Sequence, residues 1–493
     1  MGSKITKMCI ILIAVLFALF ACSNPVENAG ISSDEAAVAG ESSADRTIYS
    51  VHRVGAGLRV MGSKRFPQHI ASWGQYGLAR PKGLSNNYMD NEVKKYYDKW
   101  KKDYFYCAIP HKAGCMNKEY AYVKQSGKET INGKEIKFKT TSEAMGYGMI
   151  IMAIMAGYET KAQKYFDALY RTVRHCPSKM DGKINYNLTS WIGFGSKLGN
   201  GKVLSDNAPD GDMDIAFALL MAYRQWDNKY YLYQAHKRMK AIYDSNINYK
   251  NTNYPRINLG DWGNDPGEKK WYNALRSSDW MPSHFKAFSK YDSAYQRRCM
   301  WKKLLDRTDN LIDTIQSPEG LVPDFATGTS SLVPVGSNFM EDQYDGCYNY
   351  NACRYPLRMA CYISQYAPGK WYRPWGSSTF VYSETPYEKQ LKKLLRWAMD
   401  ECLGWPQNFK EGYSLSGGPI EKGPSPAFVG PITAAAIVCG SEESLKGKCP
   451  SFLKRGFLYL KDNFKKPNGE EGYYESTLGL LSMFVINGNW WGP

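Results

Sequence analysis

The sequence predicts an all-α protein, and three observations lead to that prediction. Apolar residues recur at three- and four-residue steps in many segments, whereas runs that alternate apolar and polar residues are few. Apolar residues make up 43% of the 493 residues, which is enough for a large core. Loops rich in Gly, Asn, Asp and Pro separate the apolar segments, and no strict repeat period is visible. A large helical domain is therefore expected.

Examples of these helical segments follow one another along most of the chain. They are Met149–Ala156, Ala162–Val173, Ile215–Trp226, Tyr231–Tyr243, Cys299–Ile315, Pro356–Tyr366, Tyr387–Cys402 and Ser476–Val485. From about Ile48 the chain becomes aromatic and mixed in composition, and no second break follows. We therefore expect residues 48–493 to form one domain.

The N-terminal segment has the pattern of an export signal. Lys4 and Lys7 precede an apolar run, Met8–Ala21, that is too short to span a membrane as a helix. The run ends in Leu-Phe-Ala-Cys, which resembles a bacterial lipobox and makes Cys22 the expected lipidation site. The Met-Gly start with Thr6 also fits N-myristoylation, but the apolar run behind it favours export. We expect a lipoprotein anchored to a bacterial membrane and facing the periplasm or the cell surface.

The signal segment, residues 1–22, is followed by a stretch that differs from everything after it. Residues 23–47 are mostly small, polar and acidic, without an aromatic residue, which predicts a disordered tether. Export also favours disulfides. Cys107 with Cys115 and Cys439 with Cys449 are close enough in sequence to be candidate pairs, although the sequence leaves the connectivity open.

Charge and composition narrow the class of partner. The formal net charge is +16, but the lysines are dispersed and form neither a long basic block nor a nucleic-acid-binding motif, so no nucleic acid is expected. A cationic surface suits acidic polysaccharide or lipid, and it speaks against a polycation such as chitosan. The chain holds 37 Tyr and 14 Trp, whose flat apolar faces with a polar edge suit sugar rings. With six His, no HExxH and no paired zinc spacing, neither a metal nor a cofactor is expected.

Three carboxylates gather just before an apolar helix in APDGDMDIAFALLMAYRQW, residues 208–226. Asp210 and Asp214 are four apart and share a helix face, with Asp212 between them. An acidic helix start is the simplest reading, because the helix dipole favours acids there. A calcium loop is a poor alternative, because the Gly and Glu that it requires are absent at the matching positions.

The same stretch resembles the signature of glycoside hydrolase family 8, with Pro209 in place of the usual Ser or Thr before the first Asp. The resemblance implies an (α/α)6 barrel, a single catalytic domain and inverting, endo-acting hydrolysis of β-linked polysaccharides. It also implies that Asp210 holds the distorted sugar at the subsite where the bond is cleaved.

A second match lies upstream, in Thr-Thr-Ser-Glu-Ala-Met-Gly-Tyr-Gly, residues 140–148. It resembles the family's Ser-Glu-Gly-Gln-Gly-Tyr-Gly, whose Glu is the general acid, so the resemblance assigns that role to Glu143. Helix capping alone explains a Glu at this place, but not the Gly-Tyr-Gly, which lets something large approach the backbone. A general acid needs a carboxyl with a raised pKa in a partly desolvated site.

The position that carries the general base in most of the family is not occupied by an acid here. The family's Tyr-Asp-Ala-Ser-Arg segment is matched here by Tyr-Asn-Ala-Cys-Arg, with Asn351 at the base position, and Asn cannot deprotonate water. Either the chain is inactive or another carboxylate substitutes. A subgroup with this Asn carries a Glu base on an inserted loop, and the loop at residues 338–346 resembles it. Glu341 is therefore the expected base, with Asp342 and Asp345 in reserve and an acidic surface loop as the plain alternative.

Further matches supply candidate sugar contacts over most of the chain after the tether. Those residues are Tyr147, Trp191, Trp262, Asp279, Asn351 and Arg354. For any single Trp, packing is at least as common a role as binding.

Together these features predict a monomeric, inverting endo-hydrolase of β-1,4 or mixed β-1,3/1,4 glucan such as cellulose or lichenan. Its partners would be that polysaccharide and a lipid anchor. A chitosanase or a xylanase of the same family is an alternative. The other is a surface glycan-binding protein without activity, which Asn351 favours and the intact Glu143 and Glu341 disfavour.

Overall fold

The computed structural model describes residues 63–69, 78–107, 119–131, 134–193, 205–248, 255–366, 370–373, 378, 381–467 and 471–493. The chain divides into two units, Met1–Arg59 and Val60–Pro493, and all described residues belong to the second. The predicted signal segment, Cys22 and the tether lie outside the described residues, so they and the domain start at residue 48 stay predictions. Within the described ranges, no helix combines the length and the apolar character that a membrane crossing requires.

The described part of the chain contains twelve helices of ten or more residues, and they alternate between an outer and an inner position. The outer helices are α3 (Asn86–Tyr104), α5 (Ala162–Arg174), α7 (Lys229–Asn246), α10 (Tyr295–Ile315), α12 (Pro386–Glu401) and α15 (Cys449–Asp462). The inner helices are α4 (Ser142–Met155), α6 (Pro209–Trp226), α9 (Pro282–Tyr291), α11 (Tyr355–Tyr366), α13 (Pro426–Ala435) and α16 (Glu471–Ile486).

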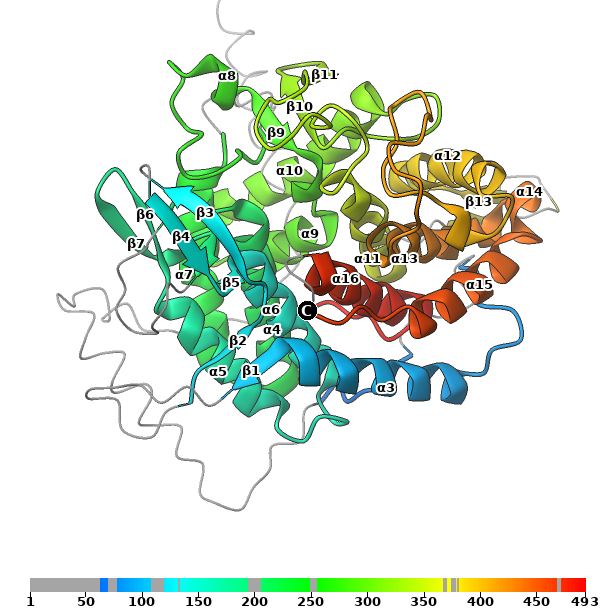
Figure 1. Ribbon diagram of the computed structural model, residues 1–493, viewed down its shortest axis with the longest axis horizontal. Helices are drawn as coiled ribbons and strands as arrows, with labels where there is room; N and C mark the ends of the chain where they lie inside the picture. The colour runs from blue at the N-terminus through cyan, green and yellow to red at the C-terminus, as the bar shows by residue number, and fades with distance from the viewer. Residues whose placement is uncertain are drawn as a thin grey trace, which may run out of the picture. The chain divides into compact units, whose positions relative to one another are not determined.

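Contacts between these helices define an (α/α)6 barrel, as predicted. Each inner helix packs on the next, from α4 through α6, α9, α11 and α13 to α16. The outer helices cover this ring: α5 packs on α4, α7 on α6, α10 on α9, α12 on α11, α15 on α13, and α3 on α16 (Figure 1).

Burial separates the two rings. In α4, every residue except Glu143 is buried, because this helix is apolar or small on all its faces. An outer helix such as α5 instead buries one stripe and leaves Gln163 and Lys164 on the other side. The single position of α4 that is not fully buried thus lies at its first turn, where the acid is predicted, and that side chain is only 15% exposed.

Two glycines set the distance between α4 and α6. A Cβ atom at Gly146 would lie 2.6 Å from Cβ of Asp214, and one at Gly211 would lie 2.3 Å from Oγ of Ser142. Both contacts are far too short for carbon, so only glycine permits this approach. The large group that the Gly-Tyr-Gly segment admits is therefore helix α6, which brings Glu143 and Asp210 to the same end of the barrel.

The strands are short, pair antiparallel and lie in loops between helices. They are β1 (Phe105–Cys107), β2 (Ala121–Val123), β3 (Gly127–Ile131), β4 (Lys134–Phe138), β5 (Thr140–Thr141), β6 (Pro177–Met180), β7 (Lys183–Thr189), β8 (Ile192–Gly193), β9 (Ala274–Arg276), β10 (Phe325–Gly328), β11 (Leu332–Pro334), β12 (Lys370–Tyr372) and β13 (Val381–Ser383). The pairs are β1–β2, β3–β4, β5–β8, β6–β7 and β12–β13, with one three-stranded sheet in the order β11–β10–β9. In that sheet Phe325 is opposite Arg276, which places this arginine at the rim of the barrel.

Short helices complete the connections. They are α8 (Lys269–Tyr272), α14 (Glu443–Lys446) and the 3₁₀ helices η1 (Ser277–Asp279), η2 (Ala352–Arg354), η3 (Pro406–Asn408) and η4 (Ala436–Ser441). All the helical segments named from the sequence overlap helices of the structure. The segments named from the sequence do not include helix α13. It begins at Pro426, a favoured first residue of a helix, but contains Pro431, and proline normally breaks a helix interior. Cys449 is disulfide-bonded; its pairing with Cys439 stays a prediction, and so does Cys107–Cys115, because Cys115 lies outside the described residues.

Candidate active site

The three carboxylates of α6 point in different directions. Asp212 is fully buried and accepts hydrogen bonds from Arg238 of α7 and from the backbone N–H of Thr189 at 3.0 Å. Asp214 is also fully buried and accepts from Nη1 and Nη2 of Arg358, both at 2.8 Å. Only Asp210 faces the end of the barrel where Glu143 lies. Two of the three acids therefore stabilise the fold, and one is left for the site.

Asp210 and Asp214 form a matched ladder with two arginines of the neighbouring segment. Arg354 binds Asp210 at 2.8 Å, and Arg358, four residues later, binds Asp214. Arg354 ends η2 and Arg358 lies in the following α11, and their four-residue spacing equals that of Asp210 and Asp214, which brings the pairs into register. Burial alone would raise the pKa of Asp214, but Arg358 and His284 at 2.8 Å hold it down at about 2. This buried anion locks α6 against α11.

Glu143 occupies the first turn of α4, where the hydroxyl of Thr141 caps the helix. Its Oε2 accepts from Nη1 of Arg354 at 2.6 Å, and the Tyr473 hydroxyl donates to Oε1 at 3.4 Å. Burial raises the pKa of Glu143 to about 7, with Arg354 acting to lower it and Asp210 to raise it. The carboxyl can thus carry its proton near neutral pH, as a general acid must.

Arg354 links the acid to the region of the expected base. Its Nη1 donates to both Glu143 and Asp210, and its Nη2 donates to Oδ1 of Asn351 at 2.8 Å. Nδ2 of Asn351 in turn donates to Oε2 of Glu341 at 2.8 Å. A continuous chain of hydrogen bonds therefore runs Glu143, Arg354, Asn351, Glu341. The structure brings together residues 143, 210, 351, 354 and 341, which the sequence analysis selected.

Glu341 has a second cationic partner that the sequence did not reveal. Arg276, at the end of β9, donates to its Oε1 at 2.9 Å. The Glu341 side chain nevertheless remains 45% exposed, so water has access to it. Asp324 holds the segment that carries Asn351, the other donor to Glu341. It accepts the backbone N–H groups of Asn351 at 3.1 Å and Ala352 at 2.6 Å. A charge-assisted frame thus holds the carboxylate of Glu341 in place.

The loop that carries Glu341 is fastened by Asp345. This buried carboxylate accepts the backbone N–H groups of Met340 at 2.7 Å, Glu341 at 3.0 Å and Asp342 at 3.1 Å. Asp342 is exposed and accepts the N–H of Tyr344 at 2.6 Å. Of the two reserve candidates for the base, Asp345 is therefore occupied by the backbone and Asp342 closes a local turn.

Aromatic residues reach this loop from α8. Phe339 packs edge-to-face on Trp271 with 5.2 Å between ring centres, and Trp271 packs in the same way on Trp262 at 5.4 Å. Nζ of Lys270 lies 3.8 Å from the centre of the Trp271 ring and donates to the carbonyl of Phe339 at 3.1 Å. Trp262 is half-buried and stands at the outer end of this row.

The remaining predicted sugar contacts lie around Glu143. The Trp191 carbonyl accepts the N–H of Ser142 at 3.0 Å, while its half-buried ring packs edge-to-face on Phe138. Tyr147 is buried one turn below Glu143, and its hydroxyl accepts from Arg358 at 3.3 Å. Both residues support the first turn of α4.

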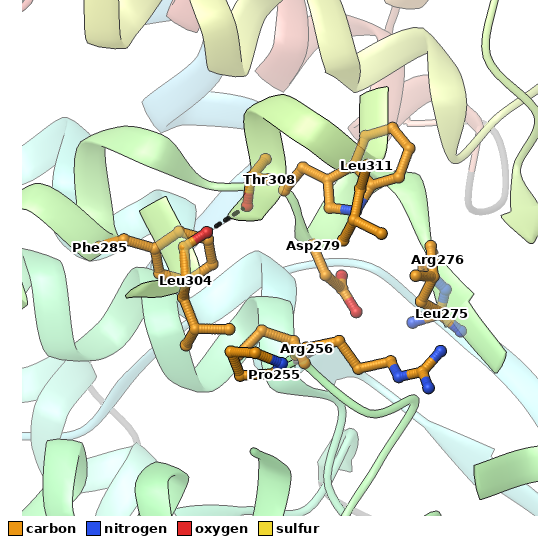
Figure 2. Close-up of a pocket in the computed structure, with 11 residues that line it drawn as sticks. Pro255, Arg256, Leu275, Arg276, Asp279, Phe285, Leu304, Thr308 and Leu311 are labelled. Carbon is orange, nitrogen blue, oxygen red and sulfur yellow. Dashed lines mark hydrogen bonds between the residues drawn. The ribbon is translucent and has the colours of Figure 1, made fainter. Parts of the chain in front are cut away.

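Asp279 lies in η1, close enough to Asp210, Arg276 and Arg354 for their charges to act on its carboxylate. Figure 2 shows its carboxylate pointing into a small cavity that is bordered by Arg256, Arg276 and apolar side chains of α10. Oδ1 accepts from Ser278 at 3.3 Å, and among the described residues Oδ2 has no hydrogen-bond partner. Burial raises the pKa of Asp279 to about 7, and the charge of Asp210 adds to the rise.

Three parts of the hydrogen-bonded frame around Glu143 and Glu341 were not predicted from the sequence. They are Arg276, Tyr473 and the anchoring role of Asp324. Arg276 stands three residues before the predicted sugar contact Asp279, and that proximity was the available signal for it. In the described part of the chain, no three His, Cys, Asp or Glu side chains are grouped as a metal site would require.

Comparison with known proteins relates this chain to one family of glycoside hydrolases. Residues 95–371 match the model of the family described as Glycosyl hydrolases family 8. A β-glucanase of Niallia circulans is 33% identical over 442 residues, which cover 87% of this chain and 91% of the relative. An endoglucanase of Bacillus sp. (strain KSM-330) is 32% identical over 87% of this chain and 82% of its own length.

Solved structures share the fold. The apo structure of a β-1,3-1,4-glucanase from Paenibacillus sp. X4 aligns with a TM-score of 0.69 and 31% identity, over 87% of this chain and 99% of that one. A cold-adapted family 8 xylanase aligns with a TM-score of 0.61 over 86% of this chain and 97% of its own, at 17% identity, which indicates the fold alone.

Proposed function

The chain belongs to glycosyl hydrolase family 8, and on that basis we propose that it is an inverting, endo-acting hydrolase of β-1,4 or mixed β-1,3/1,4 glucan. The single observation that carries the mechanism is the hydrogen-bonded chain from Glu143 through Arg354 and Asn351 to Glu341. It joins a buried carboxyl with a raised pKa to an exposed carboxylate. The names of the relatives support glucan as the substrate, since they are a β-glucanase and an endoglucanase.

Glu143 and Glu341 would divide the reaction between them. Glu143 gives its proton to the glycosidic oxygen as the bond from that oxygen to the anomeric carbon breaks. Glu341 removes a proton from water, whose oxygen forms the new bond to the anomeric carbon from the opposite face, which inverts its configuration. After one turnover Glu143 is ionised and Glu341 is protonated. Exchange with solvent restores both groups.

Asp210 and Arg354 would position the reacting groups. Asp210 is held by Arg354 beside Glu143 and would hydrogen-bond the sugar whose bond is cleaved. The guanidinium of Arg354 also stabilises the Glu143 carboxylate that remains after proton donation. We propose Trp262 and Asp279 as further sugar contacts, because one is half-exposed near the base loop and the other has a carboxylate oxygen without a partner among the described residues. Tyr147 and Trp191 stay predictions.

One panel of substrates tests the proposal. Reducing-sugar release from lichenan, carboxymethyl-cellulose, xylan and chitosan should be highest on the two glucans and lost in Glu143→Gln. Reducing-sugar release from xylan or chitosan alone would show that glucan is not the substrate, and it would leave the proposed acid and base mechanism in place. Binding of glucan without release from any polymer would favour the non-catalytic alternative.

We also propose that the protein is exported and lipidated at Cys22, because the short apolar run ends in a lipobox-like sequence. Replacing Cys22 by Ser should release the protein from the membrane fraction without loss of specific activity, because acyl chains contribute about 0.8 kcal/mol per buried methylene. Unchanged membrane association of that variant would rule out the anchor.

A further inference from the structure

A cavity of about 460 Å³ lies on the outer ring, between the end of α12 and helix α15. Its lining combines apolar side chains with groups that can bind hydroxyls. The apolar residues are Met399, Leu403 and Phe452, and the polar ones are Asp400, Lys448, Ser451 and Arg455. None of these residues contributes to the candidate active site. A mixed lining of this size is typical of a small-ligand site rather than of a packing defect.

The rim of this cavity displays apolar surface in an unusual way. Leu403 follows α12 with a φ of 52°, in the left-handed region, and its side chain is 80% exposed. A helix end normally places Gly or Asn in this conformation, because a larger side chain is disfavoured there. Because the Leu403 side chain is exposed, its burial does not offset the free-energy cost of the left-handed backbone conformation. A large apolar group held outward against the local preference points to contact with something outside the chain.

Trp405 lies beside the same rim, and its indole ring is held in a fixed orientation. Its ring is 45% exposed, and the guanidinium carbon of Arg455 lies 3.9 Å from the ring centre. Arg455 is itself fixed, since its Nη1 donates to the carbonyl of Gly404 at 2.6 Å. The stacked arginine holds the indole in one orientation, which lowers the entropy lost when a ligand binds.

We propose that this cavity and its rim, formed by Leu403 and Trp405, are a second binding site for a β-glucan chain, separate from the catalytic cleft. The proposal rests on the proposed function for the identity of the polymer. A sugar ring offers an apolar face for Trp405 and Leu403, and its hydroxyls match Asp400, Lys448 and Ser451. The ligand is neutral, because Lys448 lies 3.9 Å from Asp400 and the cavity carries charges of both signs. The site would hold one part of a long chain while another part enters the cleft.

Native gel electrophoresis through embedded mixed-linkage β-glucan tests the proposal, with the full chain carrying Glu143→Gln so that the polymer stays intact. Adding Trp405→Ala or Leu403→Asn should weaken retardation at least about fivefold. Leu403→Asn cannot unfold the protein through lost packing, because the side chain is exposed and Asn tolerates the left-handed conformation. The matched control is Tyr233→Ala: that ring is 47% exposed and lies under Nζ of Lys237 at 5.0 Å, but it does not line the cavity.

Hydrolysis provides the second measurement. With Glu143 intact, Trp405→Ala and Leu403→Asn should leave kcat/KM on a short soluble glucan oligosaccharide unchanged and lower the rate on the polymer. Retardation equal to that of the parent in both variants overturns the second site, and so does retardation that disappears at high salt, which indicates an anion site. Hydrolysis without Trp405-dependent retardation removes the second site and keeps the enzyme. Trp405-dependent retardation without hydrolysis keeps the second binding site and removes the proposed enzymatic activity.

Discussion

Asn351 donates its side-chain N–H to Oε2 of Glu341 at 2.8 Å. The residue at the family's usual base position, which cannot accept a proton from water, therefore binds the carboxylate that can replace it. Arg276 supplies the second donor to that carboxylate, on the other oxygen. If Glu341 is the base, as proposed, this pair is how a chain with Asn at the usual base position keeps both an acid and a base.

Removing Glu341 should abolish turnover on every substrate. Glu341→Ala loses the base, and water must be activated whatever the leaving group is, so substrates with good leaving groups should fail as well. Added azide should restore some reaction, with a product of inverted configuration. Asn351→Ala should be milder, and Asp342→Ala, which alters a neighbouring exposed carboxylate, should stay active. An active Glu341→Ala beside an inactive Asp342→Ala would move the base to Asp342.

Removing the acid should depend on the leaving group. Glu143→Gln keeps the shape of the side chain but cannot donate the proton, so turnover on glucan should fall about 10²–10⁴-fold with binding largely kept. A substrate with a good leaving group needs less protonation and should lose far less. Steady-state kinetics on both substrates measure the difference. Near wild-type hydrolysis of glucan would leave Glu143 with a capping role only.

The pH dependence of kcat/KM should follow the protonation of Glu143. Burial raises the pKa of Glu143 to about 7, and the proton must be present for catalysis, so kcat/KM on glucan should fall as pH rises through about 7. After burial, the negative charge of Asp210 is the largest influence that raises this pKa. Asp210→Asn should therefore move the alkaline limb to lower pH, whatever its effect on the maximal rate. A limb that stays in place, or moves upward, contradicts this assignment.

Asp345 should act on catalysis through the loop. Asp345→Asn weakens the acceptor of three backbone N–H groups next to Glu341, and a displacement of about 1 Å can lower the rate about 100-fold. We expect kcat to fall with little change in KM, and the thermal unfolding midpoint to drop only slightly. Asp342→Ala is again the matched control, since it alters the same loop without touching these bonds. A change confined to KM would show that Asp345 serves binding.

Gly146 should be intolerant of even one methyl group. In Gly146→Ala the new Cβ would lie 2.6 Å from Cβ of Asp214, so α4 and α6 must separate. Overpacking of this kind costs about 1–3 kcal/mol and should also lower activity, because the two helices carry Glu143 and Asp210. Chemical denaturation of this variant and of Gly336→Ala, whose new Cβ meets nothing within 4 Å, measures the difference. Equal stability of the two variants would exclude this account of the packing.

Much of the helical order could be read from the sequence. The sequence marked α4, α6, α11 and α16 among others as apolar segments, because inner helices are apolar over most of their surface. The (α/α)6 arrangement came from the resemblance, since periodicity does not say which helices are neighbours. Helix α13 shows the limit of local signals: its tertiary contacts with α11 and α16 outweigh the proline in its interior, Pro431.

For the site, the sequence by itself determined which residue types were present: a Glu at the start of α4, three acids on α6, and an Asn where a base was expected. Only the tertiary structure decided what each one does. Asp210, Asp212 and Asp214 differ little in local sequence but face Arg354, Arg238 and Arg358 from three directions. Glu143 meets Arg354 across 211 positions of the chain. A carboxylate's charge and role depend on its burial and its partners, and those partners come from segments that only folding brings together.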